Sequence, residues 1–443
     1  MYIKSDEIEK CFLGLPGNND IYLEYQKLMK AQYDKEQIEN LQKSRLKKVI
    51  EEAYSRNAFY QKRFEKAELN GNCNSIEELE SYPILTKSDI KENFIELITK
   101  DYPLKQCMRN RTSGSTGQPV VNLQDYRIHN MIFSVNFLRE RSAWGCGGMS
   151  RILMVVPKHY AIMGVEFPDY VINEITFDKV WQIHPSEEKY DYHNTFSKVR
   201  PEIIYGNPYL LLYMAHQIEE DKANIVKPKI IISSFEMLGK TERNYLSRIF
   251  ECPICDVYGL SEIGDVAWQC EKQDGYHINE ENVIVEVVDE NGKQVIEQDG
   301  DILVTSLYNY PMPIIRYKTG DRGSLTRTFC ACGRKLLRLK KIYGRNVDFI
   351  ILPSGKRISP YDLMNVMNII NIKQFQIVQE STQNIVVRYV SDLNEQVISG
   401  LKEKMRQIVE ESMEVKFECV DSIPLYGGKM KTIISLLPAE MEK

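Results

Sequence analysis

A loop rich in glycine and hydroxyl residues is the segment of this chain best suited to chemistry. It reads Thr112-Ser113-Gly114-Ser115-Thr116-Gly117-Gln118-Pro119. Its two glycines leave backbone N–H groups accessible, and its four hydroxyl side chains add hydrogen-bond donors for the oxygens of a triphosphate. It is not a Walker loop, because no Gly-Lys-Ser/Thr follows it. Taken alone, the segment is equally compatible with an ordinary Ser/Gly turn.

Cysteines gather in the second half of the chain. The segment Cys330-Ala331-Cys332-Gly333 places two thiolates close enough to share one metal, and Cys270 and His277 would complete a tetrahedral Cys3His zinc site. Cys252 and Cys255 are an alternative pair, but residues 252–257 are typical of a buried strand, where cysteine acts as a small hydrophobe. Reduced structural thiols are a third interpretation. Four protein ligands leave no open position, so the predicted metal is structural.

Four further motifs follow the loop in order along the chain. They are Tyr258-Gly259-Leu260-Ser261-Glu262, Arg316-Tyr317-Lys318-Thr319-Gly320-Asp321, Gly344-Arg345-Asn346-Val347-Asp348 and Gly428-Lys429. With residues 112–119 they resemble the adenylate-forming superfamily, which includes acyl-CoA synthetases, non-ribosomal peptide adenylation domains and luciferase. The chain length and the segments 270–278 and 330–334 most resemble its phenylacetate-CoA ligase branch, with its capsule-biosynthesis and coenzyme F390 synthetase relatives.

The resemblance implies how the chain would hold the phosphates of ATP. The hydroxyl groups of the loop and the backbone of its two glycines would bind the β- and γ-phosphates; these residues are Thr112, Ser113, Gly114, Ser115, Thr116 and Gly117. Glu262 would ligate Mg²⁺, an ion that prefers hard oxygen ligands, and Ser261 would lie near the α-phosphate.

The resemblance also implies contacts to the nucleoside. Tyr258, followed by Gly259, would pack against adenine. Asp321, an ionised carboxylate that accepts hydrogen bonds, would bind the two ribose hydroxyls. Arg345 and Glu236 complete the predicted ATP site.

Lys429 is the catalytic lysine that the resemblance implies. Its ammonium would neutralise charge where the acid attacks the α-phosphate and pyrophosphate leaves. Lys429 belongs to the end of the chain, so it acts only when that part closes on the rest. Asp348, beside Arg345, would be the hinge of this movement between two half-reactions.

The predicted reaction therefore has two steps. A carboxylic acid, aryl or arylacetic by resemblance, is joined to AMP, and the acyl group then passes to the thiol of CoA or of a carrier protein's phosphopantetheine. An adenylyltransferase of the F390 synthetase type and a catalytically silent nucleotide-binding scaffold are the alternatives. We expect the substrate pocket to come from segments near 130–165, 205–215, 234–240 and 258–265, without assigning the residues that select the acid.

These residues need a scaffold of strands and helices. Apolar strands at 151–156, 203–205 and 229–232, with a helix at 209–218, predict an α/β sheet. The strands at 283–288 and 302–305, with Asn291-Gly292 after the first, predict an antiparallel segment. Apolar residues spaced by three to five in 38–54 predict a helix.

The length of 443 residues favours more than one domain. We expect a large ATP- and acid-binding domain at 1–345, whose first 105 residues are mainly helical. A small mobile α+β lid follows at 346–443. Its predicted elements are a helix after Ser359-Pro360, strands at 385–387 and 415–417, and a helix near 397–411. The fold class is α/β with a smaller second domain.

Composition limits the partners of the chain. With 57 Lys and Arg against 62 Asp and Glu, the net charge of −5 argues against a globally basic nucleic-acid-binding face. No apolar run approaches the roughly 18 residues that span a bilayer, and no signal peptide is evident. Ten cysteines are too few for a disulfide scaffold. We expect a cytoplasmic enzyme with a small acid and CoA or a carrier protein as partners, and a possible homodimer.

Overall fold

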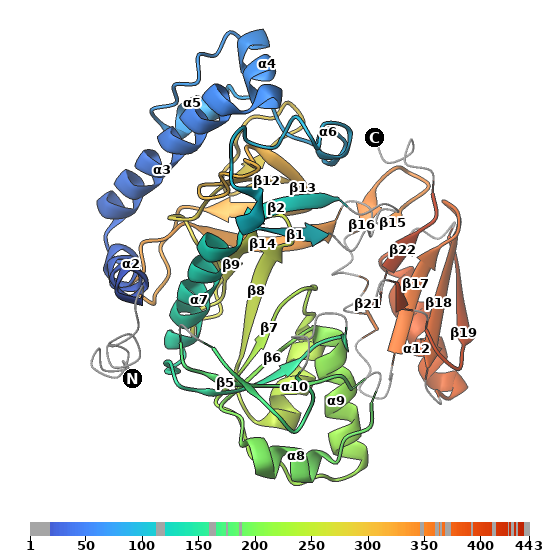
Figure 1. Ribbon diagram of the computed structural model, residues 1–443. Coiled ribbons are helices and arrows are strands. Elements are labelled where there is room, and N and C mark those ends of the chain that lie inside the picture. The colour runs from blue at the N-terminus through green and yellow to red at the C-terminus, as the bar shows by residue number, and fades with distance from the viewer. Residues whose placement is uncertain are drawn as a thin grey trace.

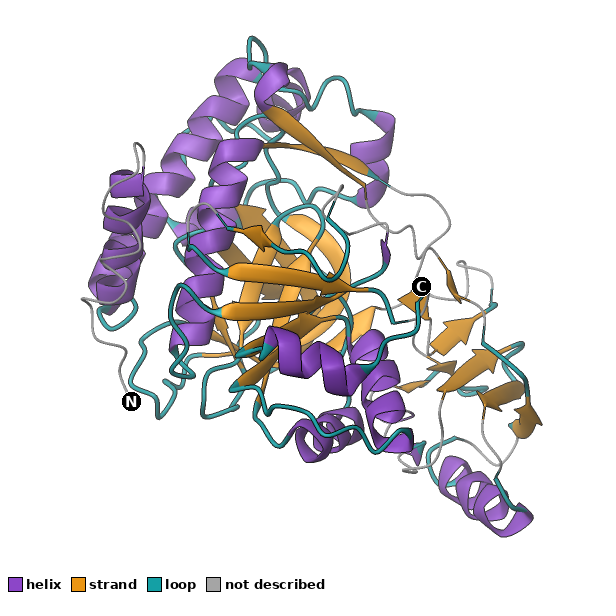
Figure 2. Ribbon diagram, turned by 60° about the horizontal axis from the view of Figure 1, so that its bottom comes forward, coloured by secondary structure: helices purple, strands orange, loops and turns teal. Residues whose placement is uncertain are grey.

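Two α/β bodies of unequal size make up the chain in the computed structural model (Figure 1). The structure describes residues 18–111, 120–158, 165–173, 176–185, 188–345, 350–358, 363, 366–367, 374–390, 393–409, 413–423, 425–426, 429–430 and 433–437. The larger body contains a twelve-stranded sheet, and the smaller one a four-stranded sheet. Figure 2 shows helices packed around the large sheet, with the small sheet to one side.

Helices occupy most of the described part of the first hundred residues, as the periodicity predicted. The longest, α3, begins after Asp34, whose side chain accepts a hydrogen bond from the Gln37 backbone N–H, as expected of an N-cap. One face of α3 is buried in the large core, including Leu46, Val49 and Ile50. The helices are α2 (Asn18–Ala31), α3 (Lys35–Arg56), α4 (Ala58–Lys66), α5 (Ile76–Leu79) and α6 (Lys87–Glu92), followed by the short η1 (Leu104–Gln106).

One continuous mixed sheet joins the parallel and antiparallel strands that the sequence predicted as separate segments. Its order is β11-β12-β13-β14-β10-β9-β8-β7-β6-β3-β5-β4. Strand β8 is the junction, since it pairs in parallel with β7 and antiparallel with β9. The strands are β3 (Arg151–Val155), β4 (Val171–Ile172), β5 (Lys179–Ile183), β6 (Ile203–Gly206), β7 (Ile230–Ser233), β8 (Ile254–Leu260), β9 (Gly264–Trp268), β10 (Tyr276–Ile278), β11 (Val283–Val288), β12 (Asp299–Ser306), β13 (Tyr317–Thr326) and β14 (Arg338–Arg345).

Helices connect β5 to β6, β6 to β7 and β7 to β8, as expected of crossovers between parallel strands. Asn207 caps α9 with its side chain, and Pro208 occupies the first turn, so the strand β6 leads directly into this helix. The fully buried, β-branched strands β6 and β7 lie side by side in parallel. The helices of this region are α7 (Tyr126–Ser142), α8 (Tyr192–Val199), α9 (Pro208–Glu220) and α10 (Lys240–Phe250). A separate hairpin of β1 (Cys107–Arg111) and β2 (Val121–Asp125) precedes α7.

The small C-terminal body has its own sheet and core. The strand order is β19-β18-β17-β22, and the core includes Leu352, Val387 and Met405. Its elements are β15 (Ile350–Ile351), β16 (Arg357–Ile358), β17 (Gln374–Gln379), β18 (Asn384–Val390), α12 (Glu395–Arg406), β19 (Glu414–Cys419), β20 (Leu425–Tyr426), β21 (Lys429–Met430) and β22 (Ile433–Ser435).

The sequence predictions for this small domain are partly confirmed. The two strands and the helix between them are present, although α12 ends at Arg406 rather than near residue 411. The predicted start of the first helix, Ser359-Pro360, lies outside the described residues. Gln374 Nε2 donates to Tyr209 Oη at 2.9 Å, and Met237 packs against the small core, so both segments of the large body contact the small domain.

Candidate active site

Two motifs that are far apart in the sequence are joined by a pair of hydrogen bonds. Tyr258 Oη donates to Asp321 Oδ2 at 2.7 Å, and Tyr317 Oη donates to Glu262 Oε1 at 2.8 Å. Each motif thus contributes one tyrosine and one carboxylate. Tyr258 is at the end of β8, and Tyr317 and Asp321 are on β13. Because both carboxylates are largely buried, these bonds fix their orientation.

Strand β2 holds the backbone of the same motif. Asn122 Nδ2 donates to the carbonyl oxygen of Ser261 at 3.2 Å, and Gln124 Nε2 donates to that of Glu262 at 2.9 Å. The hydroxyl-rich loop 112–119, the predicted phosphate-binding segment, directly precedes this strand in the chain but lies outside the described residues. Residue 120, the first after that loop, is therefore only two residues from Asn122 and four from Gln124, whose side chains contact Ser261 and Glu262.

The predicted hinge motif is connected to the same candidate site by backbone pairing between two strands. Arg345 pairs directly with Asp321 in the ladder between β13 and β14. Thr319 Oγ1 accepts a hydrogen bond from the Asp321 backbone N–H at 3.0 Å and so fixes the turn around this carboxylate. The side chain of Arg345 and the whole of Asp348 lie outside the described residues.

Glu236 and Lys429 lie on other elements. Glu236 is in the loop after β7, close enough to Tyr209 for its charge to raise the pKa of that phenol, after the larger effects of burial and Tyr213. Lys429 pairs with Tyr426 across the short hairpin of β20 and β21. Its side chain and the preceding Gly427-Gly428 lie outside the described residues. The contacts of Lys429 with the proposed site stay a prediction.

Arg316, which opens the second motif, has a structural position. Its Nε donates to both oxygens of Glu286 at 3.1 Å, and its Nη2 to Oε1 at 2.8 Å. Its Nη1 donates to the carbonyl oxygens of Glu80 and Tyr82, each at 2.7 Å. Arg316, Glu286 and Tyr82 are buried, so Arg316 ties β11 and the N-terminal helical region to the start of β13.

The predicted cysteine and histidine cluster is assembled in the structure. One ligand atom from each of Cys270, His277, Cys330 and Cys332 lies within 4.8 Å of the others. The sulfurs of Cys270 and Cys330 are 3.7 Å apart, and Cys332 Sγ is 3.3 Å from His277 Nε2. A tetrahedral zinc with bonds of about 2.3 Å has ligand-to-ligand edges of about 3.8 Å, so the spacing fits this ion.

Two members of the cluster have the protonation that a metal needs, whereas the hydrogen bond with Cys332 raises the pKa of Cys270 and burial raises the pKa of Cys330. Hydrogen bonds from Cys270 and His277 lower the pKa of Cys332 far below its usual value, which favours the thiolate that a metal binds. Burial lowers the pKa of His277, which favours the neutral ring. In contrast, Cys255 Sγ donates to the carbonyl oxygen of Gln269 at 3.2 Å, so the geometry does not favour the alternative ligand pair.

The cluster also joins distant segments. Cys270 follows β9, His277 is in β10, and the remaining pair is in the loop before β14. Arg334, just after that pair, lies 5.3 Å from the Trp268 ring centroid and donates to Oε1 of Gln32, the residue that follows α2.

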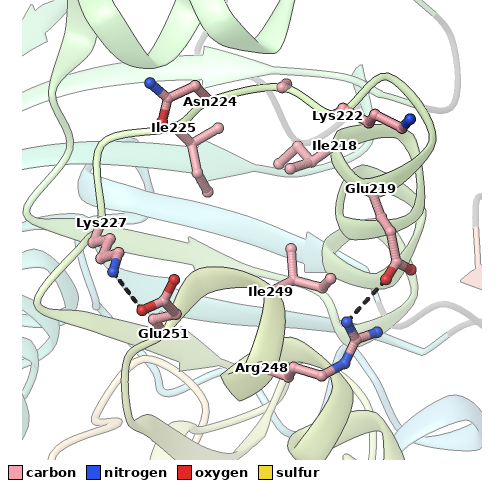
Figure 3. A pocket seen from close by; sticks show the side chains of 10 residues that line it. Ile218, Glu219, Lys222, Asn224, Ile225, Lys227, Arg248, Ile249 and Glu251 are labelled. Carbon is pink, nitrogen blue, oxygen red and sulfur yellow. Dashed lines mark hydrogen bonds and ion pairs between the residues drawn. The ribbon is translucent and has the colours of Figure 1, made fainter.

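A surface pocket of about 320 Å³ lies elsewhere in the large body (Figure 3). It is formed around the C-terminal ends of α9 and α10, with Ile218, Ile225 and Ile249 among its apolar lining residues. Ion pairs flank it, between Lys227 and Glu251 and between Arg248 and Glu219. Helix α9 is 13 residues long, so the pocket is about 20 Å from the β6 end of this helix and contains none of the predicted site residues.

Comparisons with known proteins found relatives that match most of this chain. A family model described as the CapK C-terminal domain matches residues 350–436. Protein CapK of Staphylococcus aureus is 24% identical over 412 residues, which cover 89% of this chain and 88% of that protein. The phenylacetate-coenzyme A ligase of Escherichia coli (strain K12) is 26% identical over 340 residues, 74% of this chain and 75% of the relative.

A solved structure supports the same relationship at the level of the fold. The crystal structure of 2-hydroxyisobutyryl-CoA ligase in the postadenylation state, in complex with R3-HIB-AMP, superposes with a TM-score of 0.74 at 18% identity. The match covers 91% of this chain and 90% of that one. The chain is related to the phenylacetate-CoA ligase branch of the adenylate-forming superfamily. The resemblance found in the sequence is confirmed, and so is the α/β fold with a small C-terminal domain.

The sequence patterns of this chain did not reveal several residues of the candidate site. Tyr317 lies inside a matched motif, but no pattern connects its hydroxyl with Glu262. Asn122 and Gln124 alternate on β2, a weak signal that both side chains point to one face.

Among the described helices, none is both long and apolar enough to cross a bilayer.

Proposed function

We propose that this chain activates a carboxylic acid, aryl or arylacetic, with ATP to give an acyl-AMP and passes the acyl group to a thiol. The observation that carries the proposal is the reciprocal pairing of Tyr258 with Asp321 and of Tyr317 with Glu262. It supports a single nucleotide site built from motifs that are separate in the sequence. The reaction class is supported by two of the relatives, which are named as CoA ligases.

In this proposal the two carboxylates have different tasks. Asp321 accepts hydrogen bonds from the ribose hydroxyls, and Tyr258 holds it in position. Glu262 would hold Mg²⁺, because Tyr317 occupies Oε1 and, within the described part of the chain, no hydrogen bond occupies Oε2. A bound Mg²⁺ supplies charge neutralisation for the phosphates. The loop 112–119, Ser261, Arg345 and Glu236 would complete the ATP site.

Lys429 would act from the small domain. Lys429 directly follows a glycine pair in the sequence, and its ammonium would neutralise charge at the α-phosphate as pyrophosphate leaves. We place the boundary between the two domains at residues 345 and 346, next to the proposed hinge residue Asp348. Because Arg345 is the backbone partner of Asp321, movement at this boundary would begin directly beside the ribose site.

We also propose that Cys270, His277, Cys330 and Cys332 hold one structural zinc ion. Their spacing and the thiolate character of Cys332 support it. All four ligands come from the protein, so the ion would link three segments of the antiparallel part of the sheet without taking part in the reaction.

Pyrophosphate exchange tests the proposed activation step. The purified full chain, given ATP, Mg²⁺ and a panel of acids, should exchange labelled pyrophosphate into ATP with at least one acid. Lys429→Ala should reduce this exchange at least about 100-fold, because it removes a charge that acts in the transition state. Lys431→Ala, a lysine two residues away, is the matched control and should retain exchange. Failure of every acid, or full exchange by Lys429→Ala, would contradict the proposal.

The acceptor can then be identified from the products. CoA or a phosphopantetheinylated carrier protein should yield AMP and a thioester with the acid found above. A stable AMP adduct of a cofactor hydroxyl would instead indicate an adenylyltransferase. Nucleotide binding without any turnover would indicate a scaffold.

A further inference from the structure

Aromatic rings from three elements form a continuous series beside the proposed nucleotide site. His129, Phe133 and Phe137 are spaced by four residues, so they share one face of α7. Their rings stack, with centroids 6.5 and 5.9 Å apart. Phe137 then meets Tyr205 edge to face at 5.6 Å, and Tyr205 meets Phe235 at the same distance. We call these five residues the aromatic arc.

Two members of the arc have features that packing alone does not explain. Phe235 has a φ of +78°, an uncommon conformation for a bulky residue, and its side chain is 38% exposed. His129 Nδ1 is buried and has no hydrogen-bond partner within the described part of the chain. Strain and an unpaired ring nitrogen in one series of rings favour a ligand-binding role over a purely structural one.

Asp265 lies between this arc and the nucleotide motif. In the ladder between β8 and β9 it is opposite Gly259, and a Cβ added to Gly259 would lie 3.3 Å from Asp265 Oδ1. The carboxylate therefore lies across the bare Cα of the motif glycine that follows Tyr258. Gly264, the residue before Asp265, has a φ of +106°. A Cβ added to Gly264 would lie 3.2 Å from Tyr308 Oη and 3.8 Å from His129 Cε1.

The Asp265 carboxylate has no compensating partner. Within the described residues no hydrogen bond or ion pair reaches its side chain. Two buried arginines of α7 are already paired: Arg139 Nη2 lies 2.6 Å from a Glu281 oxygen, and Arg141 Nη1 lies 2.8 Å from an Asp178 oxygen.

The surroundings of Asp265 make this lack of a partner costly. Burial raises its pKa to about 6, and its charge in turn helps to raise the pKa of Tyr205 and Tyr308, after the larger effect of burial. The Asp265 side chain is half-buried, and a carboxylate partly withdrawn from water without a partner is destabilising unless a ligand supplies one.

We propose that Asp265 selects acids that carry a hydroxyl, amino or ammonium substituent on a ring, and that the aromatic arc holds this ring. The donor group of the substrate would satisfy the carboxylate, and the stacked and edge-on rings would contact its flat faces. This inference rests on the proposed function, since it names the substrate class of the same site. It distinguishes the chain from an enzyme for an unsubstituted arylacetic acid.

Matched pairs of acids test the proposal in the pyrophosphate exchange assay. Phenylacetate is compared with 4-hydroxyphenylacetate and 4-aminophenylacetate, and benzoate with its 2-, 3- and 4-hydroxy and amino derivatives. The unaltered chain should prefer at least one substituted acid over its parent by at least about tenfold in kcat/KM, as expected for a hydrogen bond to a charged group.

Variants of Asp265 test whether its side chain causes the preference for substituted acids. Asp265→Asn keeps the shape and one acceptor oxygen, and it should reduce the preference several-fold. Asp265→Leu should abolish or reverse the preference while the KM for ATP stays nearly the same. Asp221→Leu, an exposed aspartate at the end of α9, is the control and should leave the preference unchanged. Circular dichroism checks the fold, and if Asp265→Leu is unfolded the Asp265→Asn series decides.

The outcomes separate this inference from the proposed function. Faster exchange with the unsubstituted parents would overturn the inference and leave the proposed function intact. An unchanged preference in both Asp265 variants would overturn the assignment to this residue. No exchange with any acid would instead overturn the proposed function.

Discussion

Tyr258 Oη donates a hydrogen bond of 2.7 Å to Asp321 Oδ2, although the two residues are 63 positions apart in the chain. A second bond, from Tyr317 Oη to Glu262 Oε1, runs between the same two motifs in the opposite sense. The two bonds hold strands β8 and β13, which are not neighbours in the sheet, in a fixed relation at the proposed site. Motifs that are separate in the sequence therefore act as one unit.

Loss of the Tyr258 hydroxyl should weaken ATP binding. In Tyr258→Phe the ring remains, but Asp321 loses a hydrogen bond that orients its carboxylate. We expect the KM for ATP to rise about tenfold, since a hydrogen bond to a charged group contributes about 1.5–3 kcal/mol. The measurement is pyrophosphate exchange at varied ATP. Tyr343→Phe removes a comparable tyrosine-to-aspartate bond, to the exposed Asp299, and should change the KM little. Equal effects of both variants would argue against a positioning role.

Loss of Arg316 should destabilise the fold. Arg316→Met leaves the buried Glu286 carboxylate without its partner, which costs about 3–5 kcal/mol in comparable buried pairs. We expect a clearly lower thermal unfolding midpoint, partly restored in Arg316→Met/Glu286→Leu because the uncompensated charge is then removed. Arg322→Met, on the strand β13 that follows Arg316, changes a partly exposed arginine 4.0 Å from its acidic partner and should have little effect. A midpoint unchanged in Arg316→Met would refute the structural role.

Removal of one cluster cysteine should remove the metal. Elemental analysis of the purified chain should find about one equivalent of zinc, and Cys332→Ser should contain almost none. The thermal midpoint of the variant should fall by about 5–10 °C, as expected for a loss of a few kcal/mol in a chain of this size. Cys252→Ser tests the alternative ligand pair and should retain the metal. Zinc content that depends on Cys252 and not on Cys332 would select the other site.

The raised pKa of Asp265 predicts how stability changes with pH. Its carboxyl group ionises near pH 4 when unfolded but near pH 6 when folded, so the folded state binds more protons between these values. Ionisation of Asp265 therefore lowers stability as the pH rises from 4 to 6, and the full penalty is present at pH 7. Asp265→Asn cannot ionise, and it should be more stable than the unaltered chain by about 1–2 kcal/mol at pH 7.5. The difference should largely vanish at pH 4.

Urea unfolding at the two pH values measures this difference. Glu140 is the neighbouring carboxyl group, and the charge of Asp265 helps to raise its pKa, after the larger effect of burial. The raised pKa values of Tyr205 and Tyr308 keep these phenols neutral in this range, so the same experiment with Glu140→Gln is the control for a second titrating group. A stability difference that is independent of pH would show that Asp265 does not titrate in this range.

Local patterns predicted much of the fold correctly. The sequence Gly206-Asn207-Pro208 predicted the end of a strand and the start of a helix, because a capping side chain and a first-turn proline act over a few residues. Continuity between the parallel and antiparallel strands was not predicted. It depends on β8 pairing differently at its two edges, and neither pairing leaves a periodic signal in one strand.

The sequence by itself determined which residues could do chemistry: the ordered motifs, the lysine near the end of the chain and the four metal-ligand candidates. Only the tertiary structure decided which of them meet. It joined Tyr258 to Asp321, assembled Cys270 with Cys332, and left Asp265 beside the aromatic arc without a partner. The physical reason is that residue types and short spacings follow from local backbone geometry, whereas contacts between distant residues depend on how the whole sheet is ordered and packed.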